Sequence, residues 1–213
     1  MGVCVSMKLF DITMPYKNGG AHWPGDASYT YTQVADINKG SSVNVGMISL
    51  GVHGGTHIDA PFHYLPDGKT IEKLPIESFV IPVAVVDAIG ASTLDASLTQ
   101  NIDFDKIKGV LFKTCAWKDR NEFPMDIPTV SPALALFLKS KGITLIGVDV
   151  PSVDAIEDST IKAHKAIGEC GLNILEGLML DDIPIGYYEL IALPILIEGS
   201  DASPVRAVLK QID

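Results

Sequence analysis

The stretch that decides the fold and the chemistry of this chain is His53-Gly54-Gly55-Thr56-His57-Ile58-Asp59-Ala60-Pro61-Phe62-His63. It holds three of the five histidines of the chain and one carboxylate. Imidazole and carboxylate groups bind metal ions and transfer protons. The alternative is a chance cluster of surface or core histidines, which the neighbouring aspartate and glycines make the weaker interpretation. The stretch therefore indicates a metal site.

The local conformation of this cluster follows from its glycines. The spacing of His53 and His57 matches the helical zinc motif, in which two histidines share one face of a helix. Residues 54–56 are poor helix formers, and no glutamate follows His53. We therefore expect a strand, whose period of two points His53, His57 and Asp59 to one face, with room left there by Gly55.

Two imidazoles and one carboxylate suit a divalent transition metal that keeps open coordination positions. His63 follows Pro61 on a different trajectory. It is either a fourth ligand or a proton carrier, and the near-neutral titration of imidazole favours the proton carrier.

Two more distant residues extend the site. His164 lies on the inward face of a predicted helix, and Glu176 lies in an apolar run, where an unpaired carboxylate is costly. Taken singly, His164 fits a hydrogen-bonded core histidine, and Glu176 fits a residue at a strand end that faces solvent. Taken together they suggest a second ligand group, with Asp59 bridging two ions.

The rest of the chain predicts a strand-rich α/β fold with few helices. A helix is expected over 131–142, with Ser131 as its N-cap, and another over 159–169, capped by Asp158 or Ser159. The first helix joins strands 109–114 and 143–150, which predicts that these strands pair in parallel. Residues 13–28 are expected to form a long loop. Further strands are expected at 43–52, where the strand leads into the histidine cluster, and at 80–89, 173–179, 188–197 and 204–211.

Composition limits the class of protein. The 213 residues are 47% hydrophobic and 20% charged, which suits one domain over 1–213 with a large core.

Met7 offers an alternative start, so residues 1–6 are expected to be an extension outside the fold. The net charge of −10 argues against nucleic acid or an anionic membrane as partner. No apolar run is long enough for a transmembrane helix. Three widely spaced cysteines without a C-x-x-C pair favour a reducing compartment, the cytoplasm.

At this point the residues resemble a known family. The H-x-G-T-H-x-D-A-P-x-H motif and the segments around it are similar to the bacterial kynurenine formamidases, within the metal-dependent cyclase and hydrolase family. The resemblance extends from about Phe10 to Leu209. Besides the motif, it rests on the blocks 43–46, 147–152, 163–164, 174–178, 188–194 and 201–206.

The resemblance implies a swivelling β/β/α fold with a mixed sheet, and a role for each site residue. His53, His57 and Asp59 match the ligands of one ion, and Asp59, His164 and Glu176 match those of a second. His63 matches the catalytic histidine, and Trp23 matches an aromatic residue that lines the substrate pocket. The family implies zinc, two ions per subunit, with manganese as an alternative, and a homodimer or homotetramer.

The implied activity is hydrolysis of N-formyl-L-kynurenine, a small aromatic formamide, to L-kynurenine and formate in tryptophan catabolism. A metal-activated water would attack the formyl carbon. An alternative keeps the metal and changes the substrate to a cyclic amide such as isatin, or to another aryl formamide or ester. A third possibility is an inactive metal-binding assembly protein, which the presence of His63 disfavours.

Overall fold

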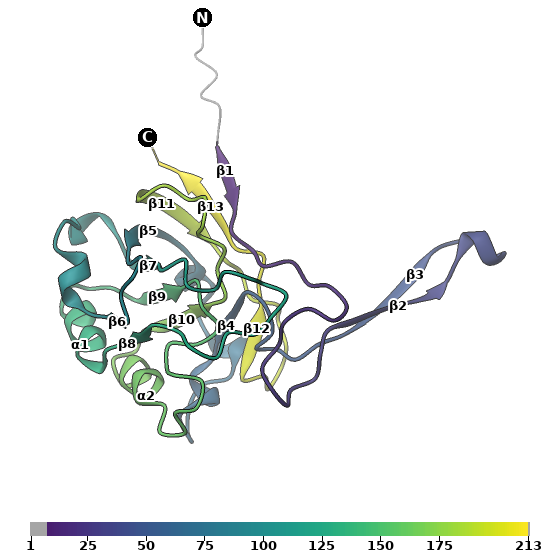
Figure 1. Ribbon diagram of the computed structural model, residues 1–213, viewed down its shortest axis with the longest axis horizontal. Coiled ribbons are helices and arrows are strands. Elements are labelled where there is room, and N and C mark those ends of the chain that lie inside the picture. The colour runs from purple at the N-terminus through teal and green to yellow at the C-terminus, as the bar shows by residue number, and fades with distance from the viewer. Residues whose placement is uncertain (1–7, 213) are drawn as a thin grey trace, which may run out of the picture.

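The computed structural model describes residues 8–212, so the predicted extension at residues 1–6 lies outside the described residues. Its central feature is a nine-stranded mixed sheet with the order β1-β13-β11-β5-β7-β9-β10-β4-β12 (Figure 1). Neighbours pair in parallel from β5 (Val80–Asp87) through β7 (Gly109–Lys113) and β9 (Leu145–Val148) to β10 (Asn173–Glu176). The flanking strands pair antiparallel: β1 (Leu9–Asp11), β13 (Val208–Gln211), β11 (Gly186–Ile191), β4 (His57–Asp59) and β12 (Ala202–Pro204).

Few helices accompany the sheet, as the sequence predicts. The described chain has the α-helices α1 (Pro132–Ser140) and α2 (Lys162–Glu169), neither long and apolar enough to cross a membrane. The α/β class with a mixed sheet is thereby confirmed. Two small sheets pair β2 (Thr30–Ala35) with β3 (Val45–Ser49) and β6 (Thr93–Leu94) with β8 (Thr129–Val130). The short 3-10 helices are η1 (Ile37–Lys39), η2 (Pro61–His63), η3 (Ile71–Lys73), η4 (Ile76–Phe79), η5 (Ala96–Thr99) and η6 (Phe104–Lys106).

Both faces of the central sheet are buried. On β7, Phe112 packs into the core beneath α1 and α2, whereas the adjacent Leu111 packs into a second core on the opposite face. Ile58 of β4 and Leu209 of β13, from opposite ends of the strand order, both join this second core, so the sheet curls around it. Strands buried on both faces give continuous apolar runs, which is why 109–112 is predicted as a strand although it does not alternate.

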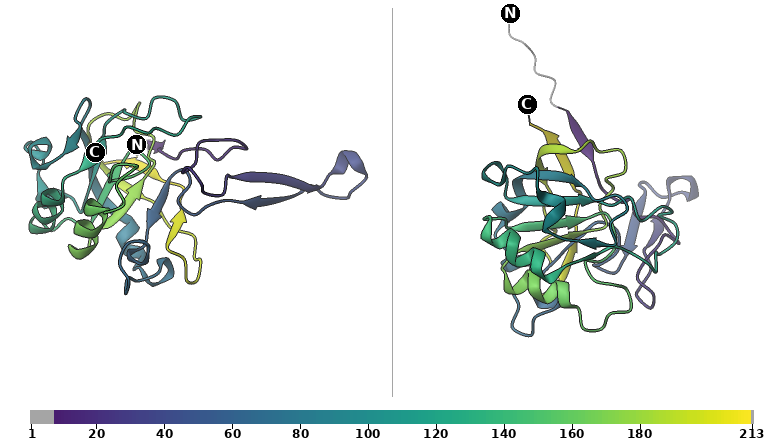
Figure 2. Two further views of the ribbon diagram at one scale, coloured as in Figure 1. Left: turned by 60° about the horizontal axis from the view of Figure 1, so that its bottom comes forward. Right: turned by 60° about the vertical axis from the view of Figure 1, so that its left-hand side comes forward.

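A two-stranded arm projects from this body. β2 and β3 form an antiparallel hairpin that extends away from the main sheet, as Figure 1 and the left view of Figure 2 show. The strand predicted at 43–52 is confirmed only over Val45–Ser49, and it lies in this arm. It ends four residues before His53, so the histidine cluster is not a direct continuation of the strand.

The predicted start is correct for the first helix and too early for the second. α1 begins at Pro132 after Ser131, and Gly142 follows it with φ of 74°, as expected. The parallel pairing of β7 with β9 is confirmed as well. α2 begins later than predicted, at Lys162, because Asp154 accepts its first backbone N–H groups instead of Asp158 or Ser159.

Candidate metal centre and active site

The pairing of β4 with β10 places three site residues on one face of the sheet. His57 and Asp59 are two residues apart on β4, and His57 lies directly opposite Glu176 of β10. Residues two apart on one strand, and residues paired across two strands, share a face. His57 Nε2 is 3.3 Å from Asp59 Oδ1 and 3.4 Å from Glu176 Oε2. All three side chains are buried, and Asp59 has no exposed surface.

The segment before β4 is a turn, so the predicted strand is wrong over residues 53–56. Gly55 has φ of 62°, a left-handed conformation that breaks the period of two. A Cβ on Gly177 would lie 2.2 Å from the carbonyl oxygen of Gly55, so these two backbones approach at a distance that only glycine permits. Thr56 donates its hydroxyl to the Gly177 carbonyl at 2.7 Å and fixes this contact. His53 still reaches the site, with Nδ1 3.0 Å from Asp59 Oδ1.

The helix α2 brings His164 to the same carboxylate. His164 Nε2 lies 3.4 Å from Asp59 Oδ2 and 3.6 Å from Glu176 Oε1. Asp154, which caps the helix, also binds His164 Nδ1 at 2.8 Å. The backbone N–H of Val153 donates to Glu176 Oε1 at 2.8 Å. The loop before α2 thus orients both distant residues toward Asp59.

His63 and Trp23 border a cavity of about 300 Å³ above this cluster. His63 ends the short helix η2, and its side chain is 35% exposed. Its ring centroid is 4.0 Å from that of His53. Trp23 is half-buried and packs edge-on against Phe123 at 5.3 Å. Together with His53, His57, His164 and Glu176, both residues line the cavity.

The electrostatics of the cluster centre on Asp59. Burial alone would raise the pKa of its carboxyl, but the surrounding imidazoles, led by His164, hold it well below its usual range. Burial would lower the pKa of His57, but Asp59 and Glu176 together raise it to about 10. Burial lowers the pKa of His63, although Asp59 opposes that shift. The centre therefore attracts positive charge, whereas His63 at its edge favours the neutral form.

The polar atoms of the centre fit a metal ion. His57 Nε2 and both carboxylate oxygens of Asp59 are buried without a hydrogen-bond partner in the described chain, an arrangement that is costly unless a cation occupies the space between them. His57 places Nδ1 3.1 Å from the Gly55 carbonyl, and His164 places Nδ1 on Asp154, so each turns Nε2 inward. Such outer partners are typical of metal-binding histidines.

Two contributors were not singled out from the sequence. Asp154 orients His164, and Asp201 lies 3.0 Å from His53 Nε2. Asp201 stands in one of the blocks that carry the family resemblance, but in a chain with 26 acidic residues a single aspartate forms no pattern. Tyr64, a buried neighbour of His164, also has a hydroxyl without a partner in the described chain.

Comparison with known proteins identifies the family of this site. The sequence model of the family described as "Putative cyclase" matches residues 10–155, which include the whole histidine cluster. The chain belongs to the cyclase family. Within this family it is 41% identical over 202 residues to the kynurenine formamidase of Bacillus cereus (strain ATCC 10987 / NRS 248), covering 95% of this chain and 97% of that protein. It is 40% identical over 205 residues to the kynurenine formamidase of Bacillus anthracis, covering 96% and 98%. The predicted family resemblance is confirmed.

Solved structures of other proteins share the fold of this cyclase-family chain. One, described as a potential metal-dependent hydrolase with cyclase activity, superposes with a TM-score of 0.83 at 28% identity and covers 98% of this chain and 100% of its own. Isatin hydrolase A from Labrenzia aggregata superposes with a TM-score of 0.80 at 23% identity, covering 97% and 94%. The second likeness establishes only the common fold.

Proposed function

We propose that this protein hydrolyses N-formyl-L-kynurenine to L-kynurenine and formate. The observation that carries the proposal is Asp59, whose two buried oxygens each face an imidazole from a different part of the chain. This ligand geometry lies at the base of a cavity with an aromatic wall. Near full-length identity of about 41% to kynurenine formamidases supports this substrate over other amides.

We assign two zinc ions to the centre. His53, His57 and Asp59 would hold one ion, and Asp59, His164 and Glu176 would hold the other, with Asp59 shared between them. The imidazoles and carboxylates are the ligand types that zinc prefers in catalytic sites. When bound, the metal supplies Lewis-acid activation of a water molecule and of the formyl carbonyl.

His63 would carry the proton. Its Nδ1 lies 3.5 Å from Asp201 Oδ2, which leaves Nε2 as the acceptor for a proton from the attacking water. The same Nε2 would then deliver the proton to the aniline nitrogen as the C–N bond breaks, so that water is divided between formate and the free amine. The neutral form that His63 favours is the form required for the first transfer.

Trp23 would hold the aromatic ring of the substrate. The cavity of about 300 Å³ has room for a single substituted benzene ring. Among the described residues that line it, Trp23 is the single tryptophan, tyrosine or phenylalanine. Phe123 packs against Trp23 and limits its movement. Offset stacking of two aromatic rings contributes about 0.5–1.5 kcal/mol.

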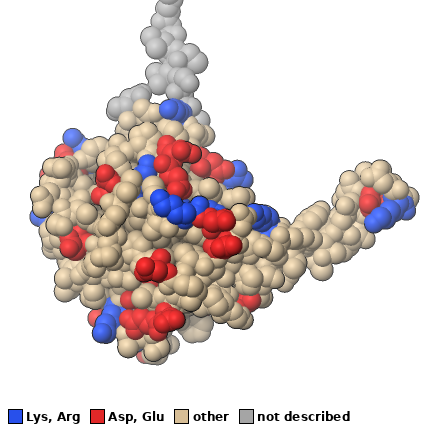
Figure 3. All heavy atoms as spheres, in the orientation of Figure 1, with Lys and Arg blue, Asp and Glu red and all other residues tan. Residues whose placement is uncertain are grey.

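A second copy of the chain would cover the arm, giving the homodimer or homotetramer that the family resemblance implies. Tyr31, Val34, Met47 and Ile48 on the arm are each about half exposed. In Figure 3 the two strands of the arm show no charged side chains between the body and the tip. Asp36 and Lys39 form an ion pair near the tip. An exposed apolar surface of this kind is typical of a subunit interface.

Cys115 and Cys170 are free, which supports a cytoplasmic location.

The test combines metal analysis with two substrates. We expect about two zinc ions per chain by elemental analysis, and formate release from N-formyl-L-kynurenine by the zinc-loaded protein. Isatin serves as the matched cyclic amide. Ring opening of isatin without formate release would show that the substrate is wrong, and zinc binding without either activity would favour the inactive metal-binding protein.

A further inference from the structure

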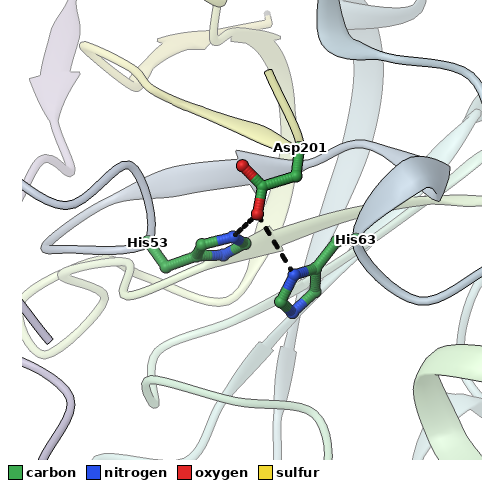
Figure 4. A group of neighbouring side chains, drawn as sticks. All are labelled: His53, His63 and Asp201. Atoms are coloured by element: carbon green, nitrogen blue, oxygen red, sulfur yellow. Dashed lines mark hydrogen bonds and ion pairs between the residues drawn. The ribbon is translucent and has the colours of Figure 1, made fainter. Parts of the chain in front are cut away.

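Asp201 lies between the histidine that faces the metal centre and the histidine that faces the cavity (Figure 4). Its Oδ2 is 3.0 Å from His53 Nε2 and 3.5 Å from His63 Nδ1. One carboxylate oxygen therefore approaches both imidazoles. Among the described residues, no other carboxylate forms an ion pair with both His53 and His63.

The backbone holds Asp201 firmly at this place. The neighbouring Ala202 begins β12 and pairs with Asp59, and the Asp201 carbonyl accepts the backbone N–H of Ala60 at 2.8 Å. The carboxylate thus projects from a segment that is hydrogen-bonded to β4, the strand that carries the metal centre. Its position relative to His53 and His63 is set by the sheet and not by a free loop.

For His53, the contact selects one tautomer. A carboxylate accepts hydrogen bonds and cannot donate them when ionised, so His53 Nε2 must carry the hydrogen. With a metal ion in the centre, the lone pair is then on Nδ1, the nitrogen on the Asp59 side, 3.0 Å from Asp59 Oδ1. His57 and His164 have the same organisation, with their outer nitrogens on Gly55 and Asp154 and their inner nitrogens facing the centre.

For His63, the same oxygen selects the opposite tautomer. Hydrogen on Nδ1, directed at Asp201, leaves the lone pair on Nε2. The distance of 3.5 Å is at the long limit of a hydrogen bond, and contacts between catalytic groups commonly tighten when substrate binds. The His63 ring also packs on the His53 ring, with centroids 4.0 Å apart, and its side chain is one-third exposed.

We propose that Asp201 is a positioning residue that sets the tautomers of His53 and His63 through a single carboxylate oxygen. It thereby couples the ability of His53 to hold the metal to the ability of His63 to accept a proton on the cavity side. The proposal rests on the proposed function, in which His53 binds metal and His63 carries the proton. A purely structural role for Asp201 would require its backbone contacts but not its charge.

The direct test observes the tautomers without relying on activity. Ring ¹⁵N–¹H correlation spectra of the zinc-loaded protein are expected to show hydrogen on Nε2 of His53 and on Nδ1 of His63. Asp201→Asn offers one neutral acceptor in place of the carboxylate and is expected to return His63 to a mixture of tautomers. If His63 in the unaltered protein carries hydrogen on Nε2, the proposal is overturned, and this result needs no variant to fold.

Two functional measurements accompany the spectra. Asp201→Asn is expected to weaken zinc binding in competition with a chelator by about 10–100-fold, the usual effect of losing an outer partner of a metal ligand. It is expected to lower kcat for formate release by a similar factor while KM changes less than about threefold, because substrate contacts are retained.

Asp103→Asn is the matched control. Asp103 is an aspartate of similar exposure that pairs with Lys106 on η6, outside the residues that line the cavity. It should leave the spectra, zinc affinity and kcat unchanged. Unaltered tautomers and zinc affinity in Asp201→Asn would refute the proposal. Should the protein lack formamidase activity altogether, the proposed substrate fails, and the spectra with the chelator competition still decide the role of Asp201.

Discussion

The candidate metal centre on β4 and the arm formed by β2 and β3 depart from the usual distribution of side chains in opposite ways. On β4, His57 is 1% exposed and Asp59 is 0% exposed, although both are polar. On the arm, Met47 is 58% exposed and Ile48 is 60% exposed, although both are apolar. Buried polar residues and exposed apolar patches are the informative exceptions in a folded protein. Each region is therefore incomplete by itself, and each requires a different kind of partner.

The free energy gained from a partner differs between the centre and the arm. A buried carboxylate without a counter-charge costs several kcal/mol, because the desolvation of charge is large in a protein interior. Exposed apolar area costs about 25 cal/mol per Å², so a few side chains must act together to reach the same free energy. Substitutions in the centre should consequently have the largest effects, and those at the arm smaller ones.

Loss of a central ligand should have the largest effect. His57→Ala removes the imidazole between Asp59 and Glu176 and leaves two buried carboxylates facing each other. We expect loss of bound metal and a decrease in kcat/KM on the order of 10⁴-fold, since metal activation supplies several kcal/mol. Elemental analysis and formate release measure these changes. His22→Ala, at the one histidine that lies neither in the centre nor on the cavity, should keep the metal. A metal-loaded His57→Ala would show that His57 is not a ligand.

Loss of the proton carrier should have the next largest effect and should separate chemistry from metal binding. His63→Gln keeps a polar side chain at the edge of the cavity but does not transfer protons near neutral pH. We expect kcat to fall by about 10³-fold, within the range for general acid–base groups, while the metal content stays unchanged. Full activity of this variant with metal bound would refute the proton-carrier role.

The arm should respond through assembly and not through metal binding. Met47→Lys combined with Ile48→Lys places two charges on its apolar surface. Loss of about 1.5 kcal/mol of burial per side chain should raise the dissociation constant of the oligomer by about 100-fold. Analytical ultracentrifugation measures this constant. Leu136→Lys on α1, where Leu136 is 66% exposed, is the control and should leave assembly intact. An unaltered protein that is already monomeric would contradict the assignment of the arm.

The smallest effect is expected at the cavity wall. Trp23→Ala should raise KM for N-formyl-L-kynurenine by about tenfold, the equivalent of about 1.4 kcal/mol of lost ring contact. kcat should change little, because the proposed contact of Trp23 is with the aromatic ring and not with the formyl group. Trp23→Phe, which retains an aromatic ring, should recover most of the affinity in steady-state measurements. A KM that stays constant in both variants would assign Trp23 to packing against Phe123 alone.

The ligand types and one helix could be predicted because their signals are local. The density of histidine around Asp59 indicates metal chemistry without knowledge of the fold, and Ser131 with Pro132 marks the start of α1. The strand expected through His53 is wrong because Gly55 adopts a left-handed conformation that lets it pack against Gly177. The start of α2 is displaced because Asp154, several residues upstream, caps it.

The sequence by itself determined which groups are available: imidazoles and a carboxylate close together, a distant histidine and glutamate, and an acidic chain with enough apolar residues for a large core. The tertiary structure alone decided how they meet. Sheet register places Glu176 opposite His57, and the pairing of β12 with β4 brings Asp201 to His53 and His63. It also decided that β3 leaves the body as an arm, since an alternating strand pattern does not specify which surface the strand will cover. Contacts between residues far apart in the chain depend on this register, and local propensity does not encode it.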